Sequence, residues 1–374
     1  MGVQAKTTRV SASSSNSFMG QRVAFPAAMR AGAMRPSARS SMKIMALDMT
    51  KPVRIGTRGS PLALAQAYMT RDLLGKAFPE LEENDLIEIT IIKTTGDKVL
   101  DKPLADIGGK GLFTREIDDA VDDGRCDIAV HSMKDVPTYM PTGQILAGML
   151  EREDTRDAFI SPHGKSFTDL PQGAVVGSAS LRRGAQMLAV RPDLKIVNFR
   201  GNVQSRIRKV GEGDVDATLL ALAGLKRMDL TDNISSILSY EDMLPAVAQG
   251  AIGLACLESN EHALELIAAL NHEETRIAAE CERNFLRALD GSCRTPIAAY
   301  CYNDNGTLKF DGLVAAPDGT KIFRDQMECE WSLENALAAG TEIGNKVKEM
   351  AGSDFMSWAT GMATEGSSFV DLKN

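Results

Sequence analysis

The stretch VRIGTRGSPLALAQAYMTRDLLGKAF, residues 53–78, contains a complete strand–turn–helix unit. Its first six residues alternate in the manner of a β-strand. Ser60 followed by Pro61 matches the N-cap and first position of a helix, because a serine hydroxyl accepts a backbone N–H and proline has none to satisfy. Apolar residues then recur with the helical period as far as Leu73. The stretch therefore predicts a strand over 53–58 and a helix that begins at Pro61.

The same alternation of strand-like and helix-like segments continues along the chain and argues for α/β layers. Further strands are expected at 86–94 and 126–133, and strand–helix units at 173–191, 194–210 and 216–228. The charged stretch 151–159 separates these two groups and is a candidate hinge. Residues 246–256 are again apolar and strand-like.

The last third of the chain has a different pattern. An amphipathic helix is expected over 272–289 and a final helix around 332–350. Between them, residues 297–331 alternate across the turn signals Asn305-Gly306 and Asp318-Gly319. This pattern predicts an antiparallel meander.

Length and composition limit the class of protein. A chain of 374 residues suggests two or three domains. No run of about 18 apolar residues predicts a membrane-spanning helix. The six cysteines show no CxxC spacing and the four histidines no HExxH or HxH pattern. Neither a disulfide scaffold nor a zinc site is therefore indicated, whereas a metal site built from carboxylates alone stays open.

Residues 1–47 differ from the rest, since they contain seven Lys or Arg residues, no acidic residue, and much Ser and Ala. This composition is typical of an organelle transit peptide, with a disordered basic tail as the alternative. Residues 48–374 carry 35 basic and 50 acidic side chains, a net charge of −15. We therefore expect no nucleic acid or membrane partner bound by bulk charge, and any bound anion requires a local cationic cluster.

Arginines stand near the starts of the expected helices, where the helix dipole normally favours acidic side chains. Arg58 precedes the first helix, Arg182 and Arg183 open another, and Arg200 and Arg206 flank the start of a third. A cation at such a position is unfavourable alone but reinforces an anion site. The set predicts a ligand with several carboxylates or phosphates beyond the carboxyl ends of the strands, although any one arginine could point to solvent. Hydroxyl donors are added by Ser60, Ser178 and Ser180.

Two further residues indicate chemistry. Asp135 follows the expected strand 126–133 among basic groups. Its carboxylate could exchange a proton with a substrate amine or stabilise a developing cation, and a turn aspartate or a salt bridge to Lys134 is the alternative. Cys293 lies in the turn LDGSCRTPIA between a helix-like and a strand-like run, where Arg294 could favour the thiolate.

One long glycine-rich segment, residues 93–113, interrupts the α/β pattern. A loop of this length is either a lid or binding loop, or a flexible surface loop. Its GGKG sequence is a weak phosphate-loop signal because the Lys-Ser/Thr ending is missing.

Nine motifs carry a resemblance to a known family. They are RIGTRGSPLALAQA (54–67), GGKGLF (108–113), DIAVHSMKDVP (127–137), VGSASLRRGAQ (176–186), FRGNVQSRI (199–207), LALAGLKR (220–227), LPAVAQGAIG (244–253), NHEETRIAAECER (271–283) and LDGSCRTPIAAY (289–300). In this order they resemble the porphobilinogen deaminase family, also called hydroxymethylbilane synthase, over roughly residues 53–350.

The resemblance implies an α/β fold of three domains. Two would be periplasmic-binding-protein-like α/β domains flanking the active-site cleft, the first formed by 48–152 plus 246–270 and the second by 153–245. The third, 271–374, would be a small α+β domain with an antiparallel sheet that bears the cofactor. Residues 1–47 would be a transit peptide directing the protein to the plastid. A monomer is implied by the family rather than by these residues.

The resemblance also implies a transferase that joins four porphobilinogen molecules head to tail, with release of ammonia, to give the linear tetrapyrrole hydroxymethylbilane. This reaction belongs to haem and chlorophyll biosynthesis. The growing chain is held on a dipyrromethane cofactor, bound here by a thioether to Cys293. Asp135 matches the catalytic aspartate, which would protonate the leaving amine and stabilise positive charge on the pyrrole intermediates. No metal is implied.

Every pyrrole carries an acetate and a propionate, so chain growth accumulates carboxylates that an acidic protein must hold through local Arg, Lys and Ser contacts. The positions that match cofactor-binding residues are Ser132, Lys134, Asp135, Ser180, Arg182, Arg183 and Cys293. Those that match substrate-binding residues are Arg58, Ser60, Lys110, Phe113, Arg200, Arg206 and Arg227. One departure is Asp106, where many bacterial relatives have a lysine, which puts one cofactor or lid contact in doubt.

Two rival functions remain. A binding protein of the same architecture would explain the arginines and the hinge, but would not explain Asp135 or require Cys293. A phosphate-handling enzyme using GGKG finds little support elsewhere in the chain. His131 is expected to be a satisfied strand-end histidine rather than a base. The other five cysteines are expected in the core or in strands, namely Cys126, Cys256, Cys281, Cys301 and Cys329.

Overall fold

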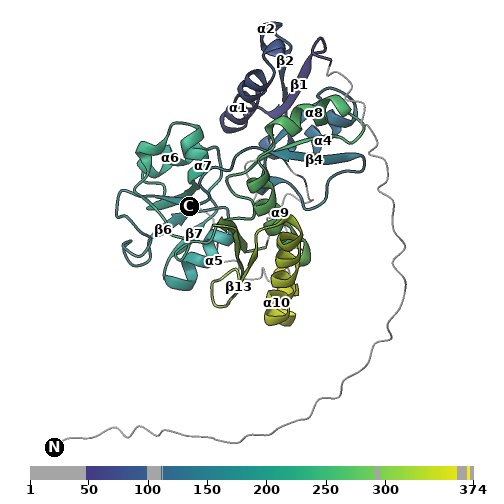
Figure 1. Cartoon of the computed structure of the whole chain (residues 1–374). Coiled ribbons are helices and arrows are strands. Elements are labelled where there is room, and N and C mark those ends of the chain that lie inside the picture. The colour runs from purple at the N-terminus through teal and green to yellow at the C-terminus, as the bar shows by residue number, and fades with distance from the viewer. Residues whose placement is uncertain (1–47, 99–110, 112, 291–294, 360–368, 371–374) are drawn as a thin grey trace, which may run out of the picture. The chain divides into compact units, whose positions relative to one another are not determined.

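The computed structural model describes residues 48–98, 111, 113–290, 295–359 and 369–370 (Figure 1). The chain divides after Ala46, and residues 47–374 form one unit. This unit contains two mixed β-sheets with flanking helices and one antiparallel sheet. This arrangement confirms the α/β fold class expected from the sequence.

The first sheet combines strands from both ends of the α/β region. It contains β1 (Val53–Arg58), β2 (Ile87–Ile92), β3 (Ile128–Ser132), β4 (Gln144–Met149) and β10 (Ile252–Leu257), in the order β2-β1-β3-β10-β4. β1 is parallel to β2 and β3, whereas β10 is antiparallel to β3 and β4. Its helices are α1 (Pro61–Ala77), α2 (Pro79–Glu83), α3 (Thr95–Lys98), α4 (Arg115–Asp122) and α8 (Glu261–Leu270).

The opening strand–turn–helix unit forms as predicted. The Ser60 hydroxyl accepts the backbone N–H of Ala63 at 3.3 Å, and Pro61 occupies the first turn of α1. Leu74 on this helix is fully buried against β1 and β3. The start of α1 is thereby fixed directly after Arg58, the last residue of β1.

The second sheet has the order β14-β7-β6-β8-β5-β9. β6 is parallel to β7 and β8, and β5 is antiparallel to β8 and β9. Its strands are β5 (Asp157–Ile160), β6 (Val175–Gly177), β7 (Lys195–Val197), β8 (Ala217–Ala221), β9 (Ser236–Ile237) and β14 (Phe369–Val370). Three α-helices, α5 (Leu181–Val190), α6 (Val203–Gly211) and α7 (Leu222–Arg227), and a 3₁₀ turn at Thr231–Asn233 complete this part.

Two segments connect the first and second sheets and lie side by side. The first crossing, residues 150–156, joins β4 to β5, and the second crossing, residues 238–251, joins β9 to β10. The backbone N–H of Glu153 donates to the carbonyl of Gly250 at 3.3 Å. Gly250 has φ +89°, and a Cβ there would collide with the Glu153 carbonyl oxygen. The two crossings can therefore approach this closely only with glycine at this position.

The strand predicted over 246–256 is too long. Residues 246–251 form turns, with Ala248 at φ +55°, and β10 begins only at Ile252. Apolar composition alone did not distinguish the buried turn from the strand that follows it.

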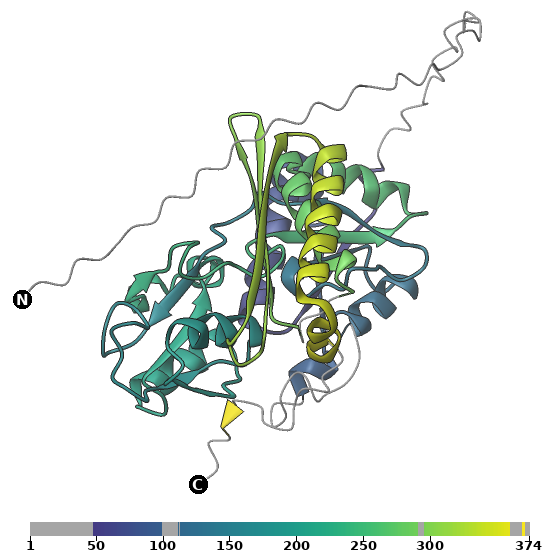
Figure 2. The same ribbon diagram turned by 90° about the horizontal axis from the view of Figure 1, so that it is seen from below.

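The third sheet is the predicted meander. It consists of β11 (Ile297–Asp304), β12 (Thr307–Ala315) and β13 (Ile322–Glu330), each antiparallel to the next. Two helices, α9 (Glu273–Ala288) and α10 (Leu333–Ala359), pack against it and against each other, and Figure 2 shows α10 alongside the strands. α10 continues beyond the expected 350, with non-helical backbone at Gly352. Among the described residues, no helix is long and apolar enough to cross a membrane.

Candidate functional site

Asp135 lies at the meeting point of two cavities. It ends a 3₁₀ turn, Met133–Asp135, that follows β3, and the fully buried Met133 anchors this turn. Asp135 lines both a larger cavity of about 910 Å³ and a smaller one of about 280 Å³. In the described part of the chain, no hydrogen bond or ion pair engages its carboxylate. The carboxylate is therefore available to a ligand in either cavity.

The larger cavity is strongly basic. Its charged lining residues are Lys134, Asp135, Arg182, Arg183 and Arg206. They come from the turn after β3, the first turn of α5 and the body of α6. Four cations against one carboxylate make this a site for a ligand with several anionic groups. The remaining lining residues are Ala179, Ser180, Ala246, Val247, Gln249, Leu286, Thr295 and Ile297.

The two neighbouring arginines are buried and already paired. Ser180 caps α5, which places Arg182 and Arg183 in the first turn with only 5% and 7% of their surfaces exposed. Both form ion pairs with the fully buried Asp157, at 2.8 and 2.7 Å. Burial alone would raise the pKa of Asp157, but the two guanidinium groups hold it well below its ordinary value.

Lys134 and Arg206 complete the cationic wall. The Lys134 side chain reaches solvent at the cavity, yet desolvation by the surrounding protein lowers its pKa to about 8, with Asp135 opposing this shift and Arg183 adding to it. Burial and the repulsion of Arg183 lower the pKa of Arg206 to about 10. Both pKa shifts show that the charged forms are disfavoured in the cavity, and a bound anion would stabilise them.

The smaller cavity is lined by polar side chains and one aromatic ring. The guanidinium carbon of Arg58 lies 4.2 Å from the centre of the Phe113 ring. The Gln66 amide and the Ser132 hydroxyl are hydrogen-bonded at 2.9 and 3.0 Å. The full lining is Arg58, Ala63, Gln66, Phe113, Thr114, Val130, His131, Ser132 and Asp135.

His131 differs from the expectation of a satisfied histidine. Its side chain is 5% exposed, and within the described chain its Nε2 atom has no hydrogen-bond partner. Burial, with a smaller contribution from Arg58, lowers its pKa to about 4. The ring is therefore neutral near pH 7, and the prediction of a fully satisfied side chain is wrong.

Most of the residues predicted from sequence come together around Asp135. Those lining one of the two cavities are Arg58, Phe113, Ser132, Lys134, Asp135, Ser180, Arg182, Arg183 and Arg206. Three lie outside both linings, since Ser60 caps α1, Arg200 follows β7, and Arg227 donates to the Gly250 carbonyl at 2.6 Å. Cys293, Lys110 and Asp106 lie outside the described residues.

Sequence reasoning missed six polar residues of the site. They are Gln66, Thr114, Asp157, Gln249 and Thr295, together with His131, which was noted only as a structural residue. Gln66 lies on the predicted helix between Ala65 and Ala67. A polar amide among small apolar residues was the signal available in the sequence. Asp157 belonged to the charged stretch interpreted as a hinge, and nothing local separated it from its exposed neighbours.

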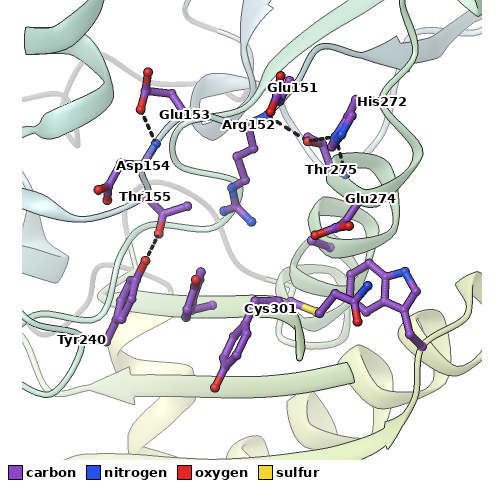
Figure 3. A pocket seen from close by; sticks show the side chains of 15 residues that line it. Glu151, Arg152, Glu153, Asp154, Thr155, Tyr240, His272, Glu274, Thr275 and Cys301 are labelled. Atoms are coloured by element: carbon purple, nitrogen blue, oxygen red, sulfur yellow. Dashed lines mark hydrogen bonds between the residues drawn. The ribbon is translucent and has the colours of Figure 1, made fainter. Parts of the chain in front are cut away.

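A third cavity, of about 660 Å³, lies away from these residues. In Figure 3 the Arg152 side chain extends from the first crossing into this cavity, and Tyr240 and Cys301 lie lower in the view. Tyr240 and Tyr300 stack there with ring centres 4.1 Å apart. None of the predicted site residues lines this cavity. The described residues contain no cluster of three His, Cys, Asp or Glu side chains that could hold a metal ion.

Comparison with known proteins gives a consistent result over most of the chain. Residues 53–265 match the family model "Porphobilinogen deaminase, dipyromethane cofactor binding domain", and residues 276–349 match "Porphobilinogen deaminase, C-terminal domain". The chloroplastic porphobilinogen deaminase of Oryza sativa subsp. japonica is 59% identical over 304 residues, covering 81% of this chain and 85% of that protein. That of Pisum sativum is 57% identical, covering 83% and 85%. The porphobilinogen deaminase of Nitrobacter winogradskyi is 48% identical, covering 82% and 96%.

Similar solved structures include two periplasmic binding proteins. One, from Salmonella typhimurium, has high arginine specificity and matches with a TM-score of 0.35 and 12% identity, covering 59% of this chain and 92% of that one. The other, the aliphatic sulphonate binding protein of Escherichia coli, matches with a TM-score of 0.35 and 13% identity, covering 64% and 71%. These TM-scores are too low to bear on function.

Proposed function

The chain belongs to the porphobilinogen deaminase family, and we propose how its residues perform that family's reaction. The protein is a transferase that joins four porphobilinogen molecules head to tail with release of ammonia. The product is the linear tetrapyrrole hydroxymethylbilane, and the cofactor is dipyrromethane. The observation that carries the assignment of roles is the position of Asp135 on the walls of both cavities.

The larger cavity has the charge for the dipyrromethane cofactor. Two pyrrole rings with an acetate and a propionate each present four carboxylates, and four cations line this cavity. Within the described residues, the buried Nε atoms of Arg182 and Arg183 have no hydrogen-bond partner. These unsatisfied donors suit a ligand rich in carboxylate oxygens.

We assign the attachment of the cofactor to Cys293. Thr295 and Ile297, two and four positions further along the chain, line the larger cavity, which supports an attachment point on this part of the sequence. When bound, dipyrromethane supplies the nucleophilic pyrrole carbon to which the first porphobilinogen is joined. Ser180, Lys134, Arg182 and Arg183 would hold its carboxylates through charge-assisted hydrogen bonds.

Asp135 would act on the reacting amine. Its carboxylate faces both cavities and is not engaged within the described chain, so it can hold a proton and give it to the departing amine. Its negative charge would also stabilise the cation that develops on the pyrrole when the amine leaves. Ser132 directly precedes the Met133–Asp135 turn and would orient a ligand beside Asp135.

The smaller cavity would receive the incoming porphobilinogen. Arg58 supplies a cation for a substrate carboxylate, and Phe113 supplies an aromatic wall beside it. Arg206 faces the larger cavity, where later rings of the growing chain would accumulate. We retain Ser60, Lys110, Arg200 and Arg227 as substrate-binding residues on the basis of their match to the family motifs.

Location, assembly state and domain boundaries complete the proposal. The relatives from rice and pea are named chloroplastic, so we propose that this protein acts in the plastid and that residues 1–47 are its transit peptide. We propose a monomer without nucleic acid or membrane partners. The domains would be 48–152 plus 246–270, 153–245 and 271–374, and the return of β10 to the first sheet supports the discontinuous first domain.

The decisive test is the intact mass of residues 48–374 made in a host that produces porphobilinogen. We expect a mass excess of two linked pyrrole units, mapped to the peptide that contains Cys293, and conversion of added porphobilinogen to hydroxymethylbilane. Cys293→Ser should lack the excess, whereas Cys301→Ser, which changes a buried thiol, should retain it. An unmodified Cys293 in folded wild-type protein would contradict the proposal and favour a carboxylate-binding protein.

A further inference from the structure

Asp157 lies behind the two cofactor-binding arginines and is itself screened from both cavities. It is the first residue of β5, is 0% exposed, and lines neither cavity. Its Oδ1 atom accepts a hydrogen bond from Arg183 Nη2 at 2.7 Å, and its Oδ2 atom lies 2.8 Å from Arg182 Nη2. Asp157 therefore cannot contact a ligand in either cavity and acts on one through its neighbours and its charge.

Each arginine is fixed at a second point by a backbone carbonyl. Arg182 donates to the carbonyl of Leu244 at 2.7 Å, and Arg183 donates to that of Leu219 at 2.9 Å. A guanidinium group held by a carboxylate and a carbonyl has a fixed plane, and its remaining N–H groups have fixed directions. The arginines are thus oriented before any carboxylate arrives.

Asp157 also connects Arg182 and Arg183 to both crossings. It directly follows the first crossing, and Gln249 of the second crossing donates to its Oδ1 atom at 3.0 Å. The same Gln249 amide donates to the Thr155 carbonyl at 2.6 Å. Figure 3 shows the adjoining part of the first crossing, where the Thr155 hydroxyl meets Tyr240.

The charge of Asp157 matters as much as its geometry. The larger cavity has four lining cations and the carboxylate of Asp135. Asp157, directly behind the arginines, lowers the local net charge from +3 to +2. A site with a higher positive charge would bind the substrate, the growing chain and the transition state more tightly. Equal tightening of all of them lowers KM without raising kcat.

We propose that Asp157 is a positioning residue that orients Arg182 and Arg183 and weakens their hold on carboxylates, so that the growing chain can move after each addition. The inference rests on the proposed function and deepens it. One buried carboxylate would thus set the balance between binding and release of the growing chain, which the arginines alone cannot do.

The test is the holoenzyme of Asp157→Asn, assayed with porphobilinogen over a range of KCl concentrations. The change keeps the side-chain shape and removes the charge. We expect kcat to fall about tenfold and KM to fall about threefold, because carboxylates are held more tightly but less productively. KM should also depend more steeply on salt than in the wild type, since the site has one more net positive charge.

Two variants act as controls. Asp193→Asn removes the partner of Arg191, an ion pair at the end of α5 that lines neither cavity, and both constants should stay within about twofold of the wild type. Asp157→Glu restores the charge, and its KM and salt dependence should return to within about twofold of the wild-type values. A purely structural role for Asp157 would lower the melting temperature in Asp157→Asn and leave KM unchanged.

A second variant covers the case in which Asp157→Asn does not fold. Gln249→Met removes an uncharged donor to Asp157, and its bond to the Thr155 carbonyl, while approximately keeping the volume; it should lower kcat about threefold without changing the salt dependence of KM. A kcat and KM of Asp157→Asn within about twofold of the wild type, or a raised KM, would overturn the inference. An unchanged kcat in Gln249→Met would do the same. Absence of turnover in the wild-type holoenzyme would instead remove the proposed function itself.

Discussion

Arg152 and Glu282 form a buried bidentate ion pair, with Nη1···Oε1 and Nη2···Oε2 distances of 2.8 and 2.9 Å. The Glu282 carboxylate also accepts the backbone N–H groups of Ala248 at 2.6 Å and Cys301 at 2.9 Å. Arg152 lies in the first crossing, Ala248 in the second, Glu282 on α9 and Cys301 on β11. One carboxylate therefore joins both crossings to the third sheet.

Replacing this carboxylate should destabilise the protein strongly. Glu282→Gln leaves the Arg152 guanidinium as a buried charge without its counterion, so we expect the free energy of unfolding to fall by about 3–5 kcal/mol. Urea unfolding followed by tryptophan fluorescence would measure the change. Glu212→Gln, which removes the exposed partner of Arg208, should cost less than about 1 kcal/mol. A loss of similar size in both variants would contradict a special role for Glu282.

Asp135→Asn should separate catalysis from stability. Asp135 has no hydrogen-bond partner in the described chain, so the variant should keep the wild-type melting temperature. Turnover of porphobilinogen should fall at least about hundredfold, because the proton donor and the negative charge are lost together. Steady-state kinetics on the purified variant would check this. More than about a tenth of wild-type turnover would show that another group protonates the amine.

The fold was largely accessible from local patterns. Ser60-Pro61 predicted the start of α1, and Asn305-Gly306 with Asp318-Gly319 predicted the turns of the meander, because caps and tight turns depend on a few adjacent residues. What local patterns did not give was the strand order. β10 lies between β3 and β4 in the first sheet, and this depends on pairing across more than 100 residues.

The candidate site was accessible in part. Arg182 and Arg183 stood out because they break the charge preference of a helix start, and both line the larger cavity. Their counterion could not be predicted, because Asp157 meets them only through the tertiary fold. Gln249 was hidden in an apolar stretch expected to be a strand, and the positive φ values of Ala248 and Gly250 become evident only from the backbone.

Arg206 and Arg208 on helix α6 offer a matched pair of substitutions. Arg206 lines the larger cavity, whereas Arg208 is exposed and paired with Glu212 at 2.6 Å. Arg206→Leu should raise KM for porphobilinogen about tenfold or more, since a charge-assisted contact to a carboxylate contributes about 1.5–3 kcal/mol. Arg208→Leu should change KM less than about twofold. Equal effects of the two changes would remove Arg206 from the site.

His131 should make the protein sensitive to mild acid. Its pKa is lowered to about 4 in the folded state by burial and by Arg58, against about 6.5 for an unperturbed histidine. As pH falls below 6.5 the unfolded chain takes up a proton that the folded protein refuses, so stability decreases toward pH 4. Between pH 7 and pH 5 this one group should cost roughly 2 kcal/mol. Urea unfolding at pH 7 and pH 5 would measure the fall in the free energy of unfolding between the two. This fall should be about 2 kcal/mol smaller in His131→Gln than in the wild type. His163→Gln, which changes an exposed histidine, should show the same fall as the wild type. An unchanged acid response in His131→Gln would mean that the ring accepts its proton in the folded protein.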